Sequence, residues 1–367
     1  MKFKNSLFAV LLTVLAVSCV IIMPIRSYGQ ISNIGSFIQS GKEDANVLAQ
    51  SYLNPAGEGF GPTLNTGWLN SPTPHKLLGF DISFRVGASI VPGDARTFDI
   101  TKLTLQNLSY QSGPTNSPTI SGEKTSGASF DVSRTINGQK YSVGSFTMPE
   151  GTGFPAVPAP MMQVGIGLIK GTDVMIRFLP KIPVKNYGDM HLFGIGVRHS
   201  INQWLPRGNL LPVNLSLFAA YTKFQTNSSL KIDPVVDSNT DNPYSNSPET
   251  WDGQKVTSTT SAFTINAVVG KSLPFIGMFA GVGYEKSSVK INTPGSYPVT
   301  VPAPTMSNPY HKTVEKIDAP IGFTMNGANS FRGLVGVQFK LAFFHINAEY
   351  VIAKYRVLST GISFSFR

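Results

Sequence analysis

The chain has 367 residues, only 14% of them charged, and its 30 Lys and Arg against 20 Asp and Glu give a formal net charge of +10. A mean hydropathy of +0.04 is too low for a bundle of membrane helices, and no segment after residue 25 offers the roughly 18 consecutive apolar residues of a spanning helix. The basic residues form no clustered run, so nucleic-acid binding is not expected. Abundant glycine, proline and aromatic residues indicate short strands joined by turns.

The first 29 residues are interpreted as a signal peptide. Two lysines precede an apolar run at 7–25, and Ser27-Tyr28-Gly29 places small residues where a signal peptidase cuts. We predict cleavage before Gln30 and export of the mature chain. Two alternatives stay open, namely an uncleaved membrane anchor and a lipoprotein attached through Cys19, the only cysteine. With cleavage before Gln30, the mature chain has no thiol for a disulfide or a metal.

Residues 30–77 lack the alternation of a strand. Between Glu43 and Leu53, apolar side chains fall on one helical face, and Asn54-Pro55-Ala56-Gly57 is predicted to end the helix. A glycine-rich stretch then leads to Trp68. We predict that this partly helical segment folds back into a barrel as a plug or hatch. A periplasmic tail or a lid under the barrel is the alternative.

From residue 78 to 367, apolar and polar residues alternate repeatedly, which is typical of strands. Phe80–Ile90 is the clearest case, with Phe80, Ile82 and Phe84 on one face and charged or small residues on the other. In a membrane-spanning barrel such strands face lipid outward and a polar lumen inward. Nine further segments share this pattern: 164–168, 174–178, 193–198, 213–222, 263–269, 276–284, 335–341, 344–350 and 357–367.

The fold class predicted from these segments is an all-β, transmembrane antiparallel barrel of about 12 strands, within a range of about 10 to 14. Additional strands are predicted within 98–110 and 130–146. Long connections at 92–161, 226–255 and 292–322 alternate with short ones, as in bacterial outer-membrane barrels. We therefore expect the outer membrane of a Gram-negative bacterium, contact with outer-membrane lipid and lipopolysaccharide, and insertion by the barrel-assembly machinery.

Several residues on the inward face are candidates for a site, because an Arg or Lys facing lipid at the bilayer midplane costs about 2 to 4 kcal/mol. The charged candidates are Asp81, Arg85, Arg177, Arg198, Lys340 and Glu349, and the aromatic candidates are Phe218 and Phe279. Two interpretations stay open: ion pairs inside a plugged barrel, and a path for a ligand or ion. Inward glycine pairs at 165–167, 194–196 and 281–283 would let a plug approach the wall or let the strands bend.

Catalysis is not expected. None of the five histidines lies in a Gly-x-Ser-x-Gly or His-Glu-x-x-His motif. The glycine pairs lack the third glycine and the following helix of a nucleotide-binding turn. We predict no enzymatic activity, no cofactor and no metal.

The signal peptide, Asn54-Pro55-Ala56-Gly57 before the first strand, and the aromatic-rich barrel resemble the long-chain fatty-acid transporter (FadL-type) family. That resemblance implies a fourteen-strand barrel whose N-terminal hatch blocks the lumen. Residues 74–81 and 165–172 are more similar to an uncharacterised outer-membrane family, distantly similar to those transporters. The terminal Phe366-Arg367 departs from the many outer-membrane barrels that end on the aromatic residue itself. The resemblance implies passive uptake of small hydrophobic molecules. A structural or partner-binding barrel without transport is the alternative.

Overall fold

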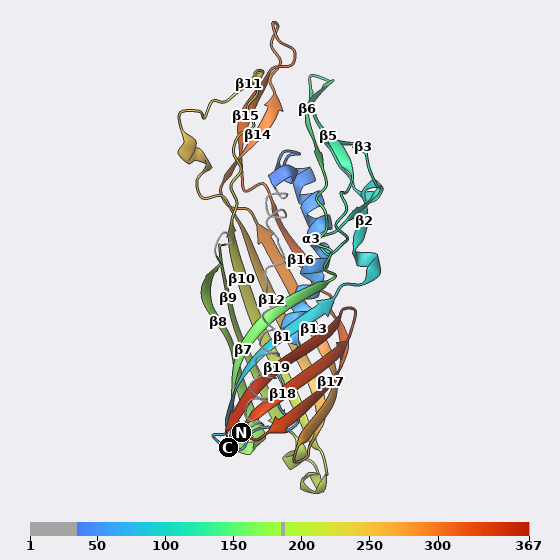
Figure 1. The fold of residues 1–367 in the computed structure, drawn as a ribbon, viewed down its shortest axis with the longest axis vertical. Coiled ribbons are helices and arrows are strands. Elements are labelled where there is room, and N and C mark those ends of the chain that lie inside the picture. The colour runs from blue at the N-terminus through green and yellow to red at the C-terminus, as the bar shows by residue number, and fades with distance from the viewer. Residues whose placement is uncertain (1–34, 185–187, 367) are drawn as a thin grey trace, which may run out of the picture.

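The computed structural model describes residues 35–184 and 188–366 (Figure 1). The predicted signal peptide, its cleavage site and Cys19 lie outside these residues. One long helix, α3 (Lys42–Asn65), precedes the strands. Among the described residues, no helix combines the length and apolarity needed to cross a membrane.

Ten antiparallel strands close into a barrel within the described part of the chain. In order around the wall they are β1 (Phe80–Ile90), β7 (Ala156–Leu168), β8 (Thr172–Val184), β9 (Gly188–Ser200), β10 (Asn214–Ser229), β12 (Lys255–Ser272), β13 (Ile276–Asn292), β17 (Ser330–Leu341), β18 (Phe344–Ile352) and β19 (Arg356–Phe366). Pairing of β1 with β19, from Phe80 opposite Phe366 to Ile90 opposite Arg356, closes the wall. A short strand, β16 (Gly322–Asn326), pairs with the end of β13. All ten segments in which alternation predicts a strand therefore lie in the wall.

The alternation also gives the correct inside and outside of the wall. On β1, Asp81 and Arg85 are buried, whereas Ile82 and Phe84 are exposed. Successive side chains of a strand point to opposite faces, so one polar and one apolar face follow directly from the sequence. The result is a barrel with an apolar exterior and a polar interior.

The central estimate of twelve strands, and the fourteen implied by the transporter resemblance, are too high for the described residues, whereas the ten wall strands lie at the lower end of the predicted range. The two additional segments lie in the connection between β1 and β7, outside the wall. They form a sheet of β3 (Leu108–Ser112), β5 (Ser129–Ile136) and β6 (Gln139–Thr147), beside a pair of β2 (Thr97–Asp99) and β4 (Asn116–Pro118). Phe130 and Val132 of β5 are buried in a protein core instead of facing lipid. Alternation indicates a strand with one apolar face but does not indicate what covers that face.

The long connections fold together at one end of the barrel (Figure 1). A second sheet there contains β11 (Thr240–Asp241), β15 (Lys312–Asp318) and β14 (Ser296–Pro302). We call residues 91–155, 230–254 and 293–329 the loop domain. Single 3-10 turns lie at Gly93–Ala95, Ile100–Lys102, Ile169–Gly171, Asn202–Trp204, Gly208–Leu210 and Pro248–Trp251.

A shared core joins the loop domain to the start of the N-terminal segment. It contains Phe37, Ile38, Leu48, Tyr52, Phe130, Val132, Met148, Tyr297 and Val299. The Tyr297 hydroxyl donates to the carbonyl of Lys255 over 3.0 Å, and burial raises the pKa of Tyr297 to about 12. The loop domain is thus a packed structure with its own core.

Asp44 ties the first turn of α3 to this loop domain. Its carboxylate is fully buried and accepts the backbone N–H groups of Gln106 over 2.8 Å and Asn107 over 2.7 Å. In Asp44→Ala both amides lose their acceptor, at a cost of about 2 kcal/mol. We expect hydrogen exchange at the two amides to accelerate by roughly 30-fold, measured by mass spectrometry. The exposed neighbour Glu43→Ala should leave exchange unchanged; equal rates in both variants would show that Asp44 restrains nothing.

Candidate functional site

The lumen is occupied by the second half of α3 and by the residues that follow it as far as His75, whereas the first turns of α3 pack in the loop domain. Helix α3 contacts β1, β7, β12, β13 and β16 and extends along the barrel from the loop domain (Figure 1). Within the lumen, Phe60 packs on Phe224 with ring centroids 4.9 Å apart. The segment predicted as a plug or hatch is therefore inside the barrel over these residues, while its action as a plug stays a prediction.

The predicted helix end at Asn54-Pro55 is wrong, because α3 continues to Asn65 with Pro55 and Pro62 inside it. Proline and glycine weaken an isolated helix, but tertiary packing overrides such propensities. Gly57 and Gly61 are buried, and a Cβ added at either one would collide with a neighbouring side chain, Met325 or Ser287. The glycines therefore allow the helix to lie close to the wall.

Four arginines from four wall strands reach the chain where α3 ends. Arg85 lies on β1, Arg177 on β8, Arg198 on β9 and Arg332 on β17, and none is more than 4% exposed. The bonds run from Arg177 to the carbonyls of Leu64 (2.7 Å) and Thr66 (2.9 Å), from Arg332 to Asn65 (3.0 Å), from Arg85 to Leu69 (2.9 Å) and from Arg198 to Ser71 (2.7 Å). We call these four residues the arginine clamp.

The arginine clamp has a clear physical basis. The last carbonyls of a helix have no partner within the helix and carry the negative end of its dipole. Arginine supplies several donors and a positive charge, and hydrogen bonds with an ionised donor are roughly twice as strong as neutral ones. The wall therefore binds the end of α3 and the segment after it at the positions where the backbone needs donors.

Trp68 fills the space beside the arginine clamp. The guanidinium carbon of Arg177 lies 3.8 Å from the centroid of the Trp68 ring, a cation–π arrangement. A Cβ at Gly196 on β9 would lie 2.9 Å from the indole, so the prediction that inward glycines admit a packed segment is confirmed there. A Cβ added at Gly281 or Gly283 would instead meet backbone atoms of β12, so these two glycines do not make room for the inserted segment.

Buried carboxylates balance the arginines. Arg332 pairs with Glu285 over 3.2 Å and lies 3.8 Å from Glu349, which also accepts the backbone N–H of Gly67 over 3.2 Å. The two glutamates, together with Asp81 and Asp173, provide four buried carboxylates in the lumen, the same number as the arginines of the arginine clamp. Charges that satisfy one another and the inserted segment favour the ion-pair interpretation of the lumen.

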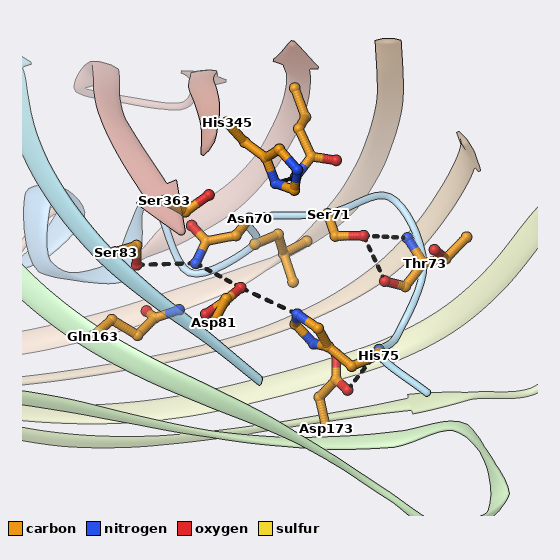
Figure 2. A network of polar contacts seen from close by, with 12 residues as sticks. Asn70, Ser71, Thr73, His75, Asp81, Ser83, Gln163, Asp173, His345 and Ser363 are labelled. Atoms are coloured by element: carbon orange, nitrogen blue, oxygen red, sulfur yellow. Dashed lines mark hydrogen bonds and ion pairs between the residues drawn. The ribbon is translucent and has the colours of Figure 1, made fainter. Parts of the chain in front are cut away.

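Nearer the rim with the short turns, Asp81 and Asp173 hold His75 between them (Figure 2). The imidazole nitrogens lie 3.3 Å from an Asp81 oxygen and 3.4 Å from an Asp173 oxygen, and the His75 backbone N–H donates to Asp173 over 2.9 Å. Asn70 donates to Asp81 and Ser83 over 3.1 and 2.9 Å. The chain is thus fixed to the wall just before it becomes β1.

The His75 contact predicts a pH dependence. Burial lowers the pKa of His75, but Asp173 and Asp81 outweigh burial and raise the pKa to about 9. The stabilisation is therefore fully present below the ordinary pKa of about 6.5 and is lost as the pH rises through about 9, a change of about 3 kcal/mol. Chemical unfolding should show this loss between pH 6 and pH 10, and His75→Gln should remove it. His311→Gln in the loop domain should retain it; a wild-type protein equally stable at both pH values would contradict the assignment.

The structure brings together seven of the eight residues predicted from sequence. Asp81, Arg85, Arg177, Arg198 and Glu349 surround residues 64–77, while Phe218 and Phe279 share an apolar cluster with Trp68. Lys340 lies apart, half-buried at the rim, where it donates to Ser272 and to the Leu273 carbonyl. The grouping around the inserted chain does not test a ligand role, which stays a prediction for all eight.

Sequence reasoning missed several members of this network, namely Trp68, Asn70, His75, Gln163, Asp173, Glu285 and Arg332. Gln163, Glu285 and Arg332 share the inward parity of their strands and lie one to three residues beyond the predicted ends, so longer strands would have included them. Trp68, Asn70 and His75 have no local signal, because their role depends on where the segment lies. Among the described residues, no three His, Cys, Asp or Glu side chains are grouped as a metal site requires.

Comparison with known proteins gives one family match. The model of a family of unknown function (DUF6588) matches residues 3–366. No curated protein matches the chain.

Solved structures give distant likenesses. Ail, the attachment invasion locus protein of Yersinia pestis, has 9% identity and a TM-score of 0.25, covering 79% of this chain and 100% of its own. The translocator domain of the autotransporter NalP from Neisseria meningitidis has 9% identity and a TM-score of 0.23, covering 79% and 88%. The transport unit of the autotransporter AIDA-I from Escherichia coli has 8% identity and a TM-score of 0.26, covering 85% and 99%. At TM-scores this low nothing is inferred from them, and they lend no support to the fatty-acid transporter resemblance.

Proposed function

Since the chain belongs to this family of unknown function, we propose its role from its own geometry. The protein is a closed outer-membrane β-barrel, plugged by residues 42–77, that carries a partner-binding loop domain outside the membrane. The observation that supports the closed state best is the arginine clamp, in which four wall strands bind consecutive parts of one inserted segment.

The exterior of the barrel supports a membrane location. Outward side chains such as Phe193 and Val282 are 56% and 68% exposed, which is unfavourable in water. On β13 the outward apolar residues extend from Ile276 to Tyr284, about 27 Å along a strand. At a tilt of about 40° this gives about 20 Å of height, close to the apolar band of outer-membrane barrels. Lys286 follows at the next outward position.

The contents of the lumen favour a closed barrel over a pore. The charged candidates that could line a path form bonds with residues of the same chain, and Phe218 packs on Trp68 with ring centroids 6.0 Å apart. A ligand would have to displace these contacts. Short turns and the end of β19 share one rim, so by the usual orientation of such barrels that rim faces the periplasm and the loop domain faces outward.

The tip of the loop domain favours a protein partner. Val235, Val236, Met306 and Tyr310 are all more than half exposed. The Lys312 N–H donates to the Asn239 carbonyl over 2.8 Å, which brings the two connections that carry these residues together. Exposed apolar side chains gathered at one place are typical of interaction sites.

Passive uptake of small hydrophobic molecules is the second candidate. It is favoured by an apolar cluster along α3, comprising Leu64, Ala159, Met161, Leu192 and Ala262 with Phe60 and Phe224 packed against it. Movement of α3 would expose this surface to a solute. The same cluster stabilises the closed state when α3 is in place.

Two measurements separate the candidates. Liposomes containing the purified protein should admit hexanoate and small sugars no faster than protein-free liposomes. A photo-reactive residue at Met306 should crosslink a protein on intact cells, whereas the same residue at Lys102, elsewhere in the loop domain, should not. Faster hexanoate entry without crosslinking at Met306 would contradict the proposal and support uptake.

A further inference from the structure

A shallow hollow lies on the outer face of the wall where β12, β13 and β17 meet. Its volume is about 530 Å³, and its apolar lining includes Leu217, Ile265, Val282, Tyr284 and Phe331. These residues have the outward parity of their strands and are between 37% and 83% exposed. The floor includes Gly333, which pairs with Val282 and has no atom within 4 Å of the position of an added Cβ.

Three lysines lie just beyond this hollow, toward the loop domain. Lys286 is the next outward residue after Tyr284 on β13, and Lys290 follows at the same parity. The third lysine, Lys223, lies on β10, on the other side of β12. It is opposite Ser261 of β12. Ser261 is in turn opposite Ser288 of β13, which lies midway between the two other lysines. Among the described residues, none of the three lysines forms an ion pair, whereas Lys181 on β8 pairs with Asp189 over 3.3 Å.

Hydroxyl groups lie between these lysines. The Tyr221 hydroxyl lies 3.2 Å from Ser261 Oγ as its donor, and Ser288 and Thr259 occupy neighbouring outward positions on β13 and β12. The nearest carboxylate along β13, Glu285, is 1% exposed and faces the lumen. The face therefore offers positive charge and hydroxyl donors directly above an apolar hollow.

We propose that this face binds a phosphorylated lipid of the outer leaflet, with its phosphate at Lys223, Lys286 and Lys290 and one acyl chain in the hollow. The proposal deepens the outer-membrane placement proposed above and rests on it. A lipid fits because the charged and apolar parts are stacked along the membrane normal. A soluble anion would need only the lysines, and a protein helix would need an apolar surface not already covered by hydrocarbon.

The test uses the full-length protein in mild detergent with two probes, lipid A carrying both phosphates and the same lipid without phosphate. Near an anionic lipid surface each lysine contributes roughly fivefold to binding. Lys223→Ser, Lys286→Ser and Lys290→Ser combined should thus weaken binding of phosphorylated lipid A roughly a hundredfold, measured by native mass spectrometry. The control combines Lys102→Ser, Lys231→Ser and Lys316→Ser, the same loss of charge in the loop domain, and should bind as the wild type does.

A second variant tests the hollow separately. Gly333→Leu adds a side chain into open space, so the barrel should fold and bind phosphorylated lipid A roughly fivefold to tenfold more weakly. Ala348→Leu, which adds similar bulk to the outer face of β18, should bind normally. Unchanged binding in the three-lysine variant, equal binding of both lipids, or full competition by inorganic phosphate would each overturn the proposal, as would unchanged binding in Gly333→Leu. Location is scored independently by membrane fractionation, so failure of the outer-membrane placement is distinguishable from failure of the lipid site.

Discussion

Arg177→Ala is expected to lower the free energy of unfolding by about 5 kcal/mol. The side chain is fully buried and donates to Leu64 and Thr66 carbonyls and to Gln163 Oε1, the last over 3.0 Å. Truncation leaves these acceptors without a charged donor, and each such bond is worth about 1.5 to 3 kcal/mol. It also removes the contact with Trp68. Urea unfolding in detergent, followed by the heat-dependent shift of gel mobility, measures the change.

Two substitutions control this result. Arg177→Lys keeps the charge but presents a single ammonium, which cannot reach acceptors in two directions, so an intermediate loss of about 2 kcal/mol is expected. Arg207→Ala removes an exposed arginine between β9 and β10 and should be neutral within about 0.5 kcal/mol. Equal stability of Arg177→Ala and the wild type would mean that the arginine clamp does not hold the segment.

Deleting residues 35–71 is expected to turn a closed barrel into a conducting one. Removal of α3 and the chain after it vacates a column about 10 Å across, the width of a helix with its side chains. The remaining lumen is lined by the arginine clamp and its carboxylates, which water can hydrate, as in open barrels with polar interiors. In planar bilayers we expect conductance to rise at least about tenfold over the wild type.

Deleting residues 303–311, at the tip of the loop domain, is the matched control and should leave conductance at the wild-type level. The heat-dependent gel shift reports whether each deleted protein still forms a barrel. A deleted protein that folds but conducts no better than the wild type would contradict the assignment of residues 42–77 as the plug. In that case other connections would have to block the lumen.

The sequence predicts the wall strands because alternation is a local pattern. A period of two residues specifies each strand and both of its faces, so Asp81, Arg85 and Arg177 could be assigned to the lumen without knowing any partner. The loop strands gave the same signal, since Phe130 and Val132 also occupy one face, and only the structure shows that protein covers them. Local pattern therefore overestimated the number of wall strands.

For a related reason, the sequence predicts only part of the candidate site. The inward charge indicates that the arginines need partners. Those partners are backbone carbonyls of Leu64, Asn65 and Thr66, and because every residue has a backbone carbonyl, the sequence does not indicate which ones accept. Pro55 appeared to end the helix because propensity describes an isolated segment, whereas the barrel supplies packing along both sides. His75 looked like a loop residue until Asp81 and Asp173 were placed beside it.

The pairing of β1 with β19 determines when the barrel can close. The inserted segment lies immediately before β1 in the chain, and β19 is made last, so the barrel cannot close until its final strand reaches its first. The arginine clamp draws its members from β1, β8, β9 and β17, so its four arginines surround the inserted segment only when these strands lie in one closed wall. Closure of the wall and completion of the arginine clamp are therefore coupled.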